Sequence, residues 1–269
     1  VTFRRPDVRR HVRSRGAKSL GGRPALGRPG GRSAAPALRC LLRLHALQHE
    51  FGVGLAVGVD ALHGATHRVM PDRIEAGTFA TAAAVIGGSI EITEIEPAHL
   101  GGFLQVLERM GVEHSVTRNT LRVSGTPQGE GSYKAVDITT APYPGLATDL
   151  QPSAGLILTR AAGVSNIHET IFEDRLEWLV GLRNFGAQVE ILDPRHARIS
   201  GPTAFTAAEA DIPDLRAGAT LMLAALAAPG ESRIHGAHHV RRGYATIEEK
   251  FRGLGAELTH VSEEEKSPA

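Results

Sequence analysis

An internal repeat is the feature that most constrains the fold of this chain. Three units follow one another from Gly77, and each runs through an alanine-rich helix, a strand, a second helix and a further strand. The first helices are predicted over residues 78–86, 150–162 and 215–228, and the strands after them over 89–93, 164–168 and 232–235. Units of this size cannot bury their own apolar faces, so the three must pack around a shared core.

The second helix of each unit is predicted to end at a glycine: Gly111, Gly186 and Gly255. A residue without Cβ readily takes the left-handed conformation that commonly ends a helix. Alternating strands follow at residues 112–116, 187–191 and 256–259. The first two units continue into one more strand, at 120–125 and 196–201, and the third does not.

The two sets of helices differ in polarity. The first helices are apolar nearly all round, whereas the second helices alternate apolar and charged residues. This difference places the first helices inside the domain and the second helices outside. The generic expectation for alternating helices and strands is an α/β fold with a parallel, doubly wound sheet.

Composition indicates whether the chain spans a membrane and in which redox compartment it belongs. The apolar fraction of 42% is enough for a core, and the longest apolar run, residues 221–228, is too short to span a bilayer. We therefore expect no membrane span. The single cysteine, Cys40, excludes an internal disulfide framework and fits a reducing compartment, so a cytoplasmic location is expected.

Charge sets residues 1–50 apart from the rest. They hold 11 Arg and one Lys against Asp7 and Glu50, a net charge of +10, so the remainder of this chain of net charge +1 carries −9. Arg, Gly, Ala and Pro dominate, which is typical of disorder, or of an out-of-frame reading of GC-rich DNA. A nucleic-acid arm is disfavoured because aromatic residues to stack on bases are scarce, and a secretory signal because no apolar stretch follows the charges.

The segment TTAPYPGLATDLQ, residues 139–151, places a carboxylate after a stiff loop. Pro142 and Pro144 restrict the backbone, and Asp149 lies where the second inner helix is predicted to begin. Asp149 is then either a helix N-cap or a chemically active acid, and caps are the commoner case. No zinc spacing, P-loop or dinucleotide fingerprint is present, so no metal and no cofactor is predicted.

This segment resembles TAPHPGFPTDMQ of the UDP-N-acetylglucosamine enolpyruvyl transferases (UDP-N-acetylglucosamine 1-carboxyvinyltransferases). Residues 68–79, RVMPDRIEAGTF, resemble the segment YRVIPDRIEAGTF in which that family crosses between its two domains. The resemblance implies an inside-out α/β barrel domain of three βαβαββ-type repeats. It also implies that Asp149 is the general base and contacts the 3-hydroxyl of the substrate sugar.

Three further segments resemble the same family and imply substrate-binding residues. ETIFEDR, residues 169–175, resembles ETIFENRF, which implies that Ile171 contacts the uracil end of the substrate and that Arg175 lies near the cleft. DLRAGA resembles ATDLRAGA, which implies that Arg216 binds carboxylate or phosphate, and RRGYATIEEK resembles DRGYERIEEK, which implies that Arg242 closes on phosphoenolpyruvate. An arginine fork suits such anions.

The reaction that the resemblance implies is transfer of enolpyruvyl from phosphoenolpyruvate to UDP-N-acetylglucosamine. This is a step of peptidoglycan precursor synthesis, and so of cell wall biogenesis, cell shape and cell division. Two departures point instead to a non-catalytic binding or regulatory domain: Arg241 replaces the family's Asp, and Trp178 replaces its His. The sister shikimate-pathway transferase is the other alternative.

The resemblance also divides the chain. Residues 1–50 are expected to be disordered or non-native, 51–70 a remnant of the other domain, 71–262 the repeat domain and 263–269 a tail. The family's remaining segments, with its Lys-Asn pair, sugar-binding arginines and loop cysteine, are not recognisable, and Cys40 does not resemble that cysteine. Truncation would impair activity, and the sequence leaves open whether another chain supplies the missing domain.

Overall fold

The structure is a computed structural model, and it describes residues 2–4, 64, 66–127 and 133–260. The chain divides into two compact units, Val1–Gly16 with Pro71–Ala269, and Ala17–Met70. Few residues of the second unit are described, and all the described helices and strands belong to the first. The predictions for residues 5–50, for most of 51–70 and for 263–269 lie outside the described residues.

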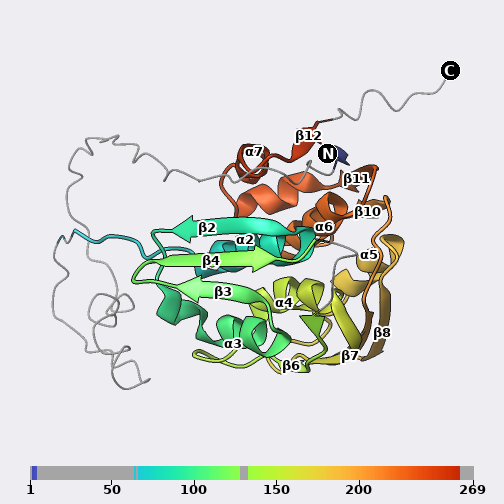
Figure 1. Cartoon of the computed structure of the whole chain (residues 1–269), viewed down its shortest axis with the longest axis horizontal. Helices are drawn as coiled ribbons and strands as arrows, with labels where there is room; N and C mark the ends of the chain where they lie inside the picture. The colour runs from blue at the N-terminus through green and yellow to red at the C-terminus, as the bar shows by residue number, and fades with distance from the viewer. Residues whose placement is uncertain (1, 5–63, 65, 128–132, 261–269) are drawn as a thin grey trace, which may run out of the picture. The chain divides into compact units, whose positions relative to one another are not determined.

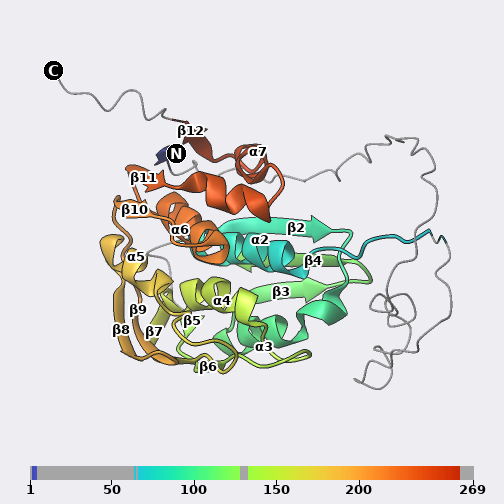
Figure 2. The same ribbon diagram turned by 180° about the vertical axis from the view of Figure 1, so that it is seen from behind.

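Three inner helices form the centre of the first unit. They are α2 (Arg73–Ile86), α4 (Gln151–Leu158) and α6 (Leu215–Ala227). Each packs against the other two, and all eight residues of α4 are buried. In Figure 2 the three helices lie side by side, with the sheet that contains β2 behind α2. The predicted inside position of the first helices is therefore confirmed.

Each repeat carries its own sheet on the outside of these helices (Figure 1). In the first repeat the order is β2-β4-β3, made of β2 (Gly88–Thr93), β3 (Glu113–Val116) and β4 (Thr120–Gly125). In the second it is β7-β9-β8, made of β7 (Ala161–His168), β8 (Gln188–Asp193) and β9 (His196–Gly201). Two short strands, β5 (Tyr133–Lys134) and β6 (Ile138–Thr139), pair in parallel with β7.

The expectation of one parallel, doubly wound sheet is wrong. Within the first two repeats the three long strands are antiparallel to their neighbours, because β3–β4 and β8–β9 are hairpins whose last strand returns to the strand after the inner helix. Burial alternates along β4 and β9, so each sheet has one covered face and one exposed face. A parallel sheet needs helices on both faces, and these repeats supply them on one.

The third sheet is completed from the other end of the chain. Its order is β10-β11-β1-β12, made of β10 (Glu209–Asp211), β11 (Glu231–His235), β12 (Glu257–Thr259) and β1 (Thr2–Arg4). β1 runs antiparallel to both β11 and β12. It thus takes the central place that β4 and β9 hold in the other two sheets. The sequence predicts no strand among residues 1–50, so β1 was missed. Three residues are too few to show the alternation of apolar and polar side chains that is typical of a strand.

The outer helices follow the repeat prediction closely. They are α3 (Gly101–Met110), α5 (Trp178–Asn184) and α7 (Ile247–Gly253). Gly111, Gly186 and Gly255 have positive φ angles of 78°, 88° and 96°, which confirms the predicted helix ends. The second inner helix ends at Leu158 rather than at residue 162, because the chain enters β7 at Ala161.

Polar side chains join the repeats inside the core. The Tyr244 hydroxyl of the third repeat hydrogen-bonds the Thr78 hydroxyl of α2 at 2.8 Å. The buried Arg160 of the second repeat donates to the Val85 carbonyl at the end of α2, at 2.7 Å. These bonds satisfy buried polar groups and fix the register between units. Among the described residues, none of the helices combines the length and the apolar character that a membrane crossing needs.

We expect Phe3→Pro to destabilise the domain by about 1–3 kcal/mol, because a proline inside a paired strand removes a backbone donor. Phe3 is paired on both sides, with Ser232 and with Leu258. Chemical denaturation would measure the change, with Phe3→Val, which keeps the backbone N–H, as the matched control. Equal stability of the two variants would show that β1 contributes little.

Alkaline pH should also destabilise the domain through Tyr244. Burial raises the pKa of Tyr244 above its ordinary value of 10.0, against the opposing hydrogen bond of Thr78 and charge of Arg216. The folded chain therefore keeps a proton that the unfolded chain loses, so this stability is present below pH 10 and is lost as pH rises through the higher folded pKa. Between pH 8 and 11 the melting temperature of Tyr244→Phe should fall less steeply than that of the wild type. Parallel curves for the two proteins would show that ionisation of Tyr244 does not cause the loss of stability.

Candidate active site

Asp149 lies in a short 3₁₀ turn, Thr148–Leu150, directly before α4. The loop ahead of it is closed by backbone hydrogen bonds, from Ala141 N to the Leu146 carbonyl at 2.9 Å and from Gly145 N to the Pro142 carbonyl at 2.8 Å. The carboxylate does not cap a helix, since no side-chain hydrogen bond caps this turn or α4. The N-cap interpretation of Asp149 is therefore wrong.

Two arginines from different repeats hold the Asp149 carboxylate. Arg175 Nη2 lies 2.6 Å from Oδ1, and Arg216 contacts Oδ2 through Nε and Nη2, each at 3.3 Å. The Asp149 side chain is 35% exposed, against 25% for Arg175 and 16% for Arg216. The carboxylate is thus oriented by two cations and still reaches solvent.

Arg216 lies in the first turn of α6, where a positive charge interacts unfavourably with the helix dipole. Asp214 caps that helix by accepting from the backbone N–H groups of Arg216 and Ala217 at 2.7 and 2.9 Å. The guanidinium lies over the Tyr244 ring, 5.4 Å from its centroid. The bond to Asp149 and this stacking offset the unfavourable position in the helix.

The charge of Arg216 is maintained by its surroundings. Burial lowers the pKa of Arg216, but the Tyr244 phenol and the carboxylates of Asp149 and Asp72 outweigh it, and the pKa is raised overall. Nη1 is buried and has no hydrogen-bond partner among the described residues. A donor of this kind, with its charge secured, is suited to an anionic oxygen.

The site lies where the inner helices begin. Asp149 lies two residues before the start of α4, and Arg216 belongs to the first turn of α6. Asp72 is the N-cap of α2 and acts electrostatically on Arg216. Asp72 and Asp214 cap the N-termini of α2 and α6, whereas no side chain caps α4. The packing of the inner helices thus brings the Asp149 carboxylate and Arg216 together beside these first turns.

The other two predicted site residues are less closely tied to Asp149. Ile171 is half-buried in the loop that leads to Arg175, and its backbone N–H donates to Glu169 at 2.9 Å. Arg242 ends the 3₁₀ helix η3 (Ala237–Arg242) and is exposed, and its side chain makes no hydrogen bond or ion pair to any other described residue. The structure therefore brings Asp149, Arg175 and Arg216 into contact, with Ile171 adjacent and Arg242 on a separate segment.

Both departures from the family pattern have structural partners. Arg241 Nε donates to the buried Glu248 carboxylate at 3.0 Å, and its Nη2 approaches His260. Trp178 is 2% exposed and donates from Nε1 to Gln151 Oε1 at 2.9 Å. It packs so closely on α4 that a Cβ at Gly155 would lie 2.7 Å from the Trp178 ring.

Sequence reasoning missed two residues of the site. Glu169 is fully buried and hydrogen-bonds the hydroxyls of Thr140 and Thr148, on the loop that carries Asp149. Tyr244 supports Arg216 from beneath. Glu169 lies in the ETIFEDR segment and Tyr244 in the RRGY segment. Each is a polar residue without an assigned role inside a specific motif, and this is the feature by which the sequence could have indicated them.

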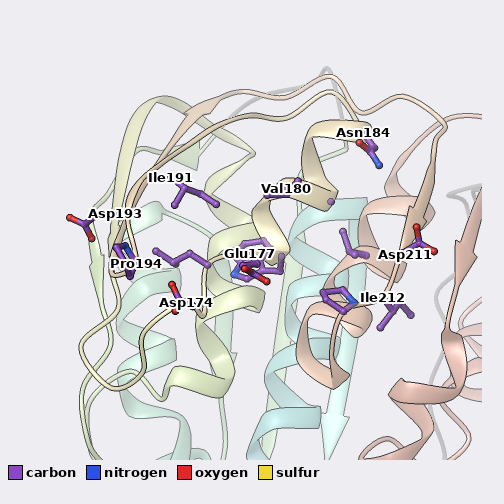
Figure 3. A pocket seen from close by; sticks show the side chains of 14 residues that line it. Asp174, Glu177, Val180, Asn184, Ile191, Asp193, Pro194, Asp211 and Ile212 are labelled. Carbon is purple, nitrogen blue, oxygen red and sulfur yellow. The ribbon is translucent and has the colours of Figure 1, made fainter.

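A pocket of about 720 Å³ lies beside this site, between the second and third repeats. Figure 3 shows the side chains that line it, including Asp174, Glu177, Val180 and Asp211. Asp149, Arg175 and Arg216 are not among the lining residues, so the pocket and the charged site are separate features. In the part of the chain that the structure describes, no group of three or more His, Cys, Asp or Glu side chains could hold a metal.

Comparison with known proteins finds relatives over most of the chain. A family model described as EPSP synthase (3-phosphoshikimate 1-carboxyvinyltransferase) matches residues 54–251. The chain is 43% identical over 206 residues to a UDP-N-acetylglucosamine 1-carboxyvinyltransferase of Koribacter versatilis, covering 77% of this chain and 46% of that protein. It is 45% identical over 201 residues to one of Caldanaerobacter subterraneus, covering 75% and 47%.

Solved structures show the same fold. The enolpyruvyl transferase NikO from Streptomyces tendae has 29% sequence identity and a TM-score of 0.65, covering 72% of this chain and 45% of that one. EPSP synthase from Acinetobacter baumannii, at 19% identity and a TM-score of 0.53, supports the fold alone. The chain spans about half the length of the relatives it matches. With three repeats, the matched motifs and these relatives in agreement, the chain belongs to the EPSP synthase family of enolpyruvyl (carboxyvinyl) transferases.

Proposed function

We propose that this domain takes part in enolpyruvyl transfer from phosphoenolpyruvate to the 3-hydroxyl of UDP-N-acetylglucosamine. The observation that carries the proposal is the Asp149 carboxylate, partly exposed and held by Arg175 and Arg216 where the three inner helices begin. The relatives at 43% and 45% identity are named for this sugar nucleotide, which favours it over shikimate 3-phosphate. The cell would use the product for peptidoglycan, in the cytoplasm.

The proposed chemistry is an addition followed by an elimination. The sugar 3-hydroxyl oxygen forms a bond to C2 of phosphoenolpyruvate, its proton passes to Asp149, and C3 gains a proton. C3 then loses a proton, the bond from C2 to the phosphate oxygen breaks, and inorganic phosphate leaves. Arg216 and Arg242 would stabilise the carboxylate and phosphate charges, while Ile171 and Arg175 would contact the sugar nucleotide. The acid that protonates C3 would come from the part of the relatives that this chain does not match.

Ligand binding is the first test. We expect UDP-N-acetylglucosamine to raise the melting temperature of the chain, because a ligand that binds only the folded state stabilises it. Arg175→Met should reduce this shift. Arg198→Met is the matched control, since Arg198 forms an exposed ion pair with Glu190 on the second sheet. Stabilisation by shikimate 3-phosphate alone would overturn the choice of substrate.

Turnover is the second test, and we expect none from this chain alone. In the family that the motifs resemble, catalysis is shared across a cleft between two domains, and losing such positioning can forfeit about 7–11 kcal/mol of the barrier. A phosphate-release assay with both substrates would measure this. Phosphate release that Asp149→Asn abolishes would show that the chain carries a complete active site. Binding with no release, even after a polypeptide for the unmatched half is added, would instead favour the non-catalytic alternative.

A further inference from the structure

Glu169 is a fully buried carboxylate that the proposed reaction does not use. It directly follows β7 and lies between the loop that carries Asp149 and the loop that carries Arg175. Four donors surround it: the Thr140 hydroxyl at 2.9 Å, the Thr148 hydroxyl at 2.9 Å, the Ile171 N–H at 2.9 Å and the Phe172 N–H at 3.3 Å. A buried charge needs such partners, and here they belong to the loops of the site.

The direction of each hydrogen bond can be assigned. Backbone N–H groups can only donate, so Ile171 and Phe172 donate to Glu169. The Thr148 oxygen accepts from Arg175 Nη1 at 3.1 Å, so the single hydroxyl proton of Thr148 is directed to Glu169 Oε2. The Thr140 oxygen likewise accepts from Thr170 N–H at 2.8 Å and donates to Oε1. All four contacts therefore suit an ionised, acceptor-only carboxylate.

The direction of the hydrogen bond from Thr148 to Glu169 affects Asp149 through Arg175. Because Thr148 must donate to Glu169, its oxygen presents a lone pair to Arg175 Nη1. With Nη1 anchored in this way, the planar guanidinium directs Nη2 to Asp149 Oδ1 at 2.6 Å. Without an acceptor at position 169, the Thr148 proton could rotate toward Arg175, and the anchor would be lost.

We propose that Glu169 is a positioning residue of this site. Acting through Thr148, it sets the orientation of Arg175 and so the placement of the Asp149 carboxylate toward the sugar nucleotide. The proposal rests on the proposed function for the identity of that ligand. Its core claim, that Glu169 controls Arg175, concerns the chain without ligand.

Three variants test the chain of bonds. Glu169→Gln keeps the shape but turns one acceptor into a donor, and Thr148→Val removes the hydroxyl. Titration calorimetry with UDP-N-acetylglucosamine should show at least about tenfold weaker binding for each, since a hydrogen bond to a charged group is lost. Thr148→Ser restores the hydroxyl and should restore the affinity, which a loss of packing alone would not predict. Should Glu169→Gln fail to fold, the Thr148 pair still decides the question.

Thr81→Val is the matched control, because the buried Thr81 hydroxyl bonds, among the residues that the structure describes, only the backbone carbonyls of Gly77 and Ser153. It should lower the melting temperature and leave the affinity unchanged. Wild-type affinity in Thr148→Val or in Glu169→Gln would overturn the proposal. So would an equal loss of affinity in Thr81→Val, which would make the effect one of general stability.

A measurement without ligand separates this proposal from the proposed function. Nitrogen-15 NMR of the arginine side chains should show hindered rotation of the Arg175 guanidinium in the wild type and in Thr148→Ser. Rotation should be fast in Thr148→Val and Glu169→Gln. If the wild type does not bind the sugar nucleotide, the proposed function fails, and these spectra alone decide the role of Glu169. Unchanged Arg175 rotation in both variants would refute it.

Discussion

Burial of three apolar helices against one another is the interaction on which the rest of the structure depends. α2, α4 and α6 are enclosed because each repeat offers one helix that is apolar nearly all round, and only the other repeats can cover it. With the helices inside, every sheet is left with one covered and one exposed face. The same packing brings the first turns of the helices together, and the charged site is built there.

The contacts of the site join the second and third repeats to each other and to α2. Asp149 and Arg175 come from the second repeat and Arg216 from the third, while Tyr244 links Arg216 to Thr78 on α2. A carboxylate bonded to two guanidiniums, one of them stacked on a buried phenol, has few alternative positions. Orientation is thus supplied by the scaffold before any ligand binds, which is the form of preorganisation that charge-stabilising sites require.

The two departures from the family pattern, Trp178 and Arg241, both have local partners in the structure. Trp178 fills space against Gly155 and satisfies its N–H on Gln151, so it serves the core. Arg241 is engaged by Glu248 and His260 within the third repeat, beside the exposed Arg242. Both substitutions are therefore accommodated by local partners, and neither disturbs the contact of Asp149 with its two arginines.

The sequence by itself determined the three repeats, the inner and outer helices and their glycine ends, because each depends on neighbours within a few residues. The family resemblance of local motifs singled out Asp149, Arg175 and Arg216, which the structure brings into contact. Only the tertiary structure decided that the repeats form three separate antiparallel sheets, that β1 completes the third, and that Asp149 bonds arginines rather than a helix end. It alone placed Glu169 beneath the site. Strand pairing and buried charges join residues far apart in the chain, and the periodicity of a single segment carries no information about such partners.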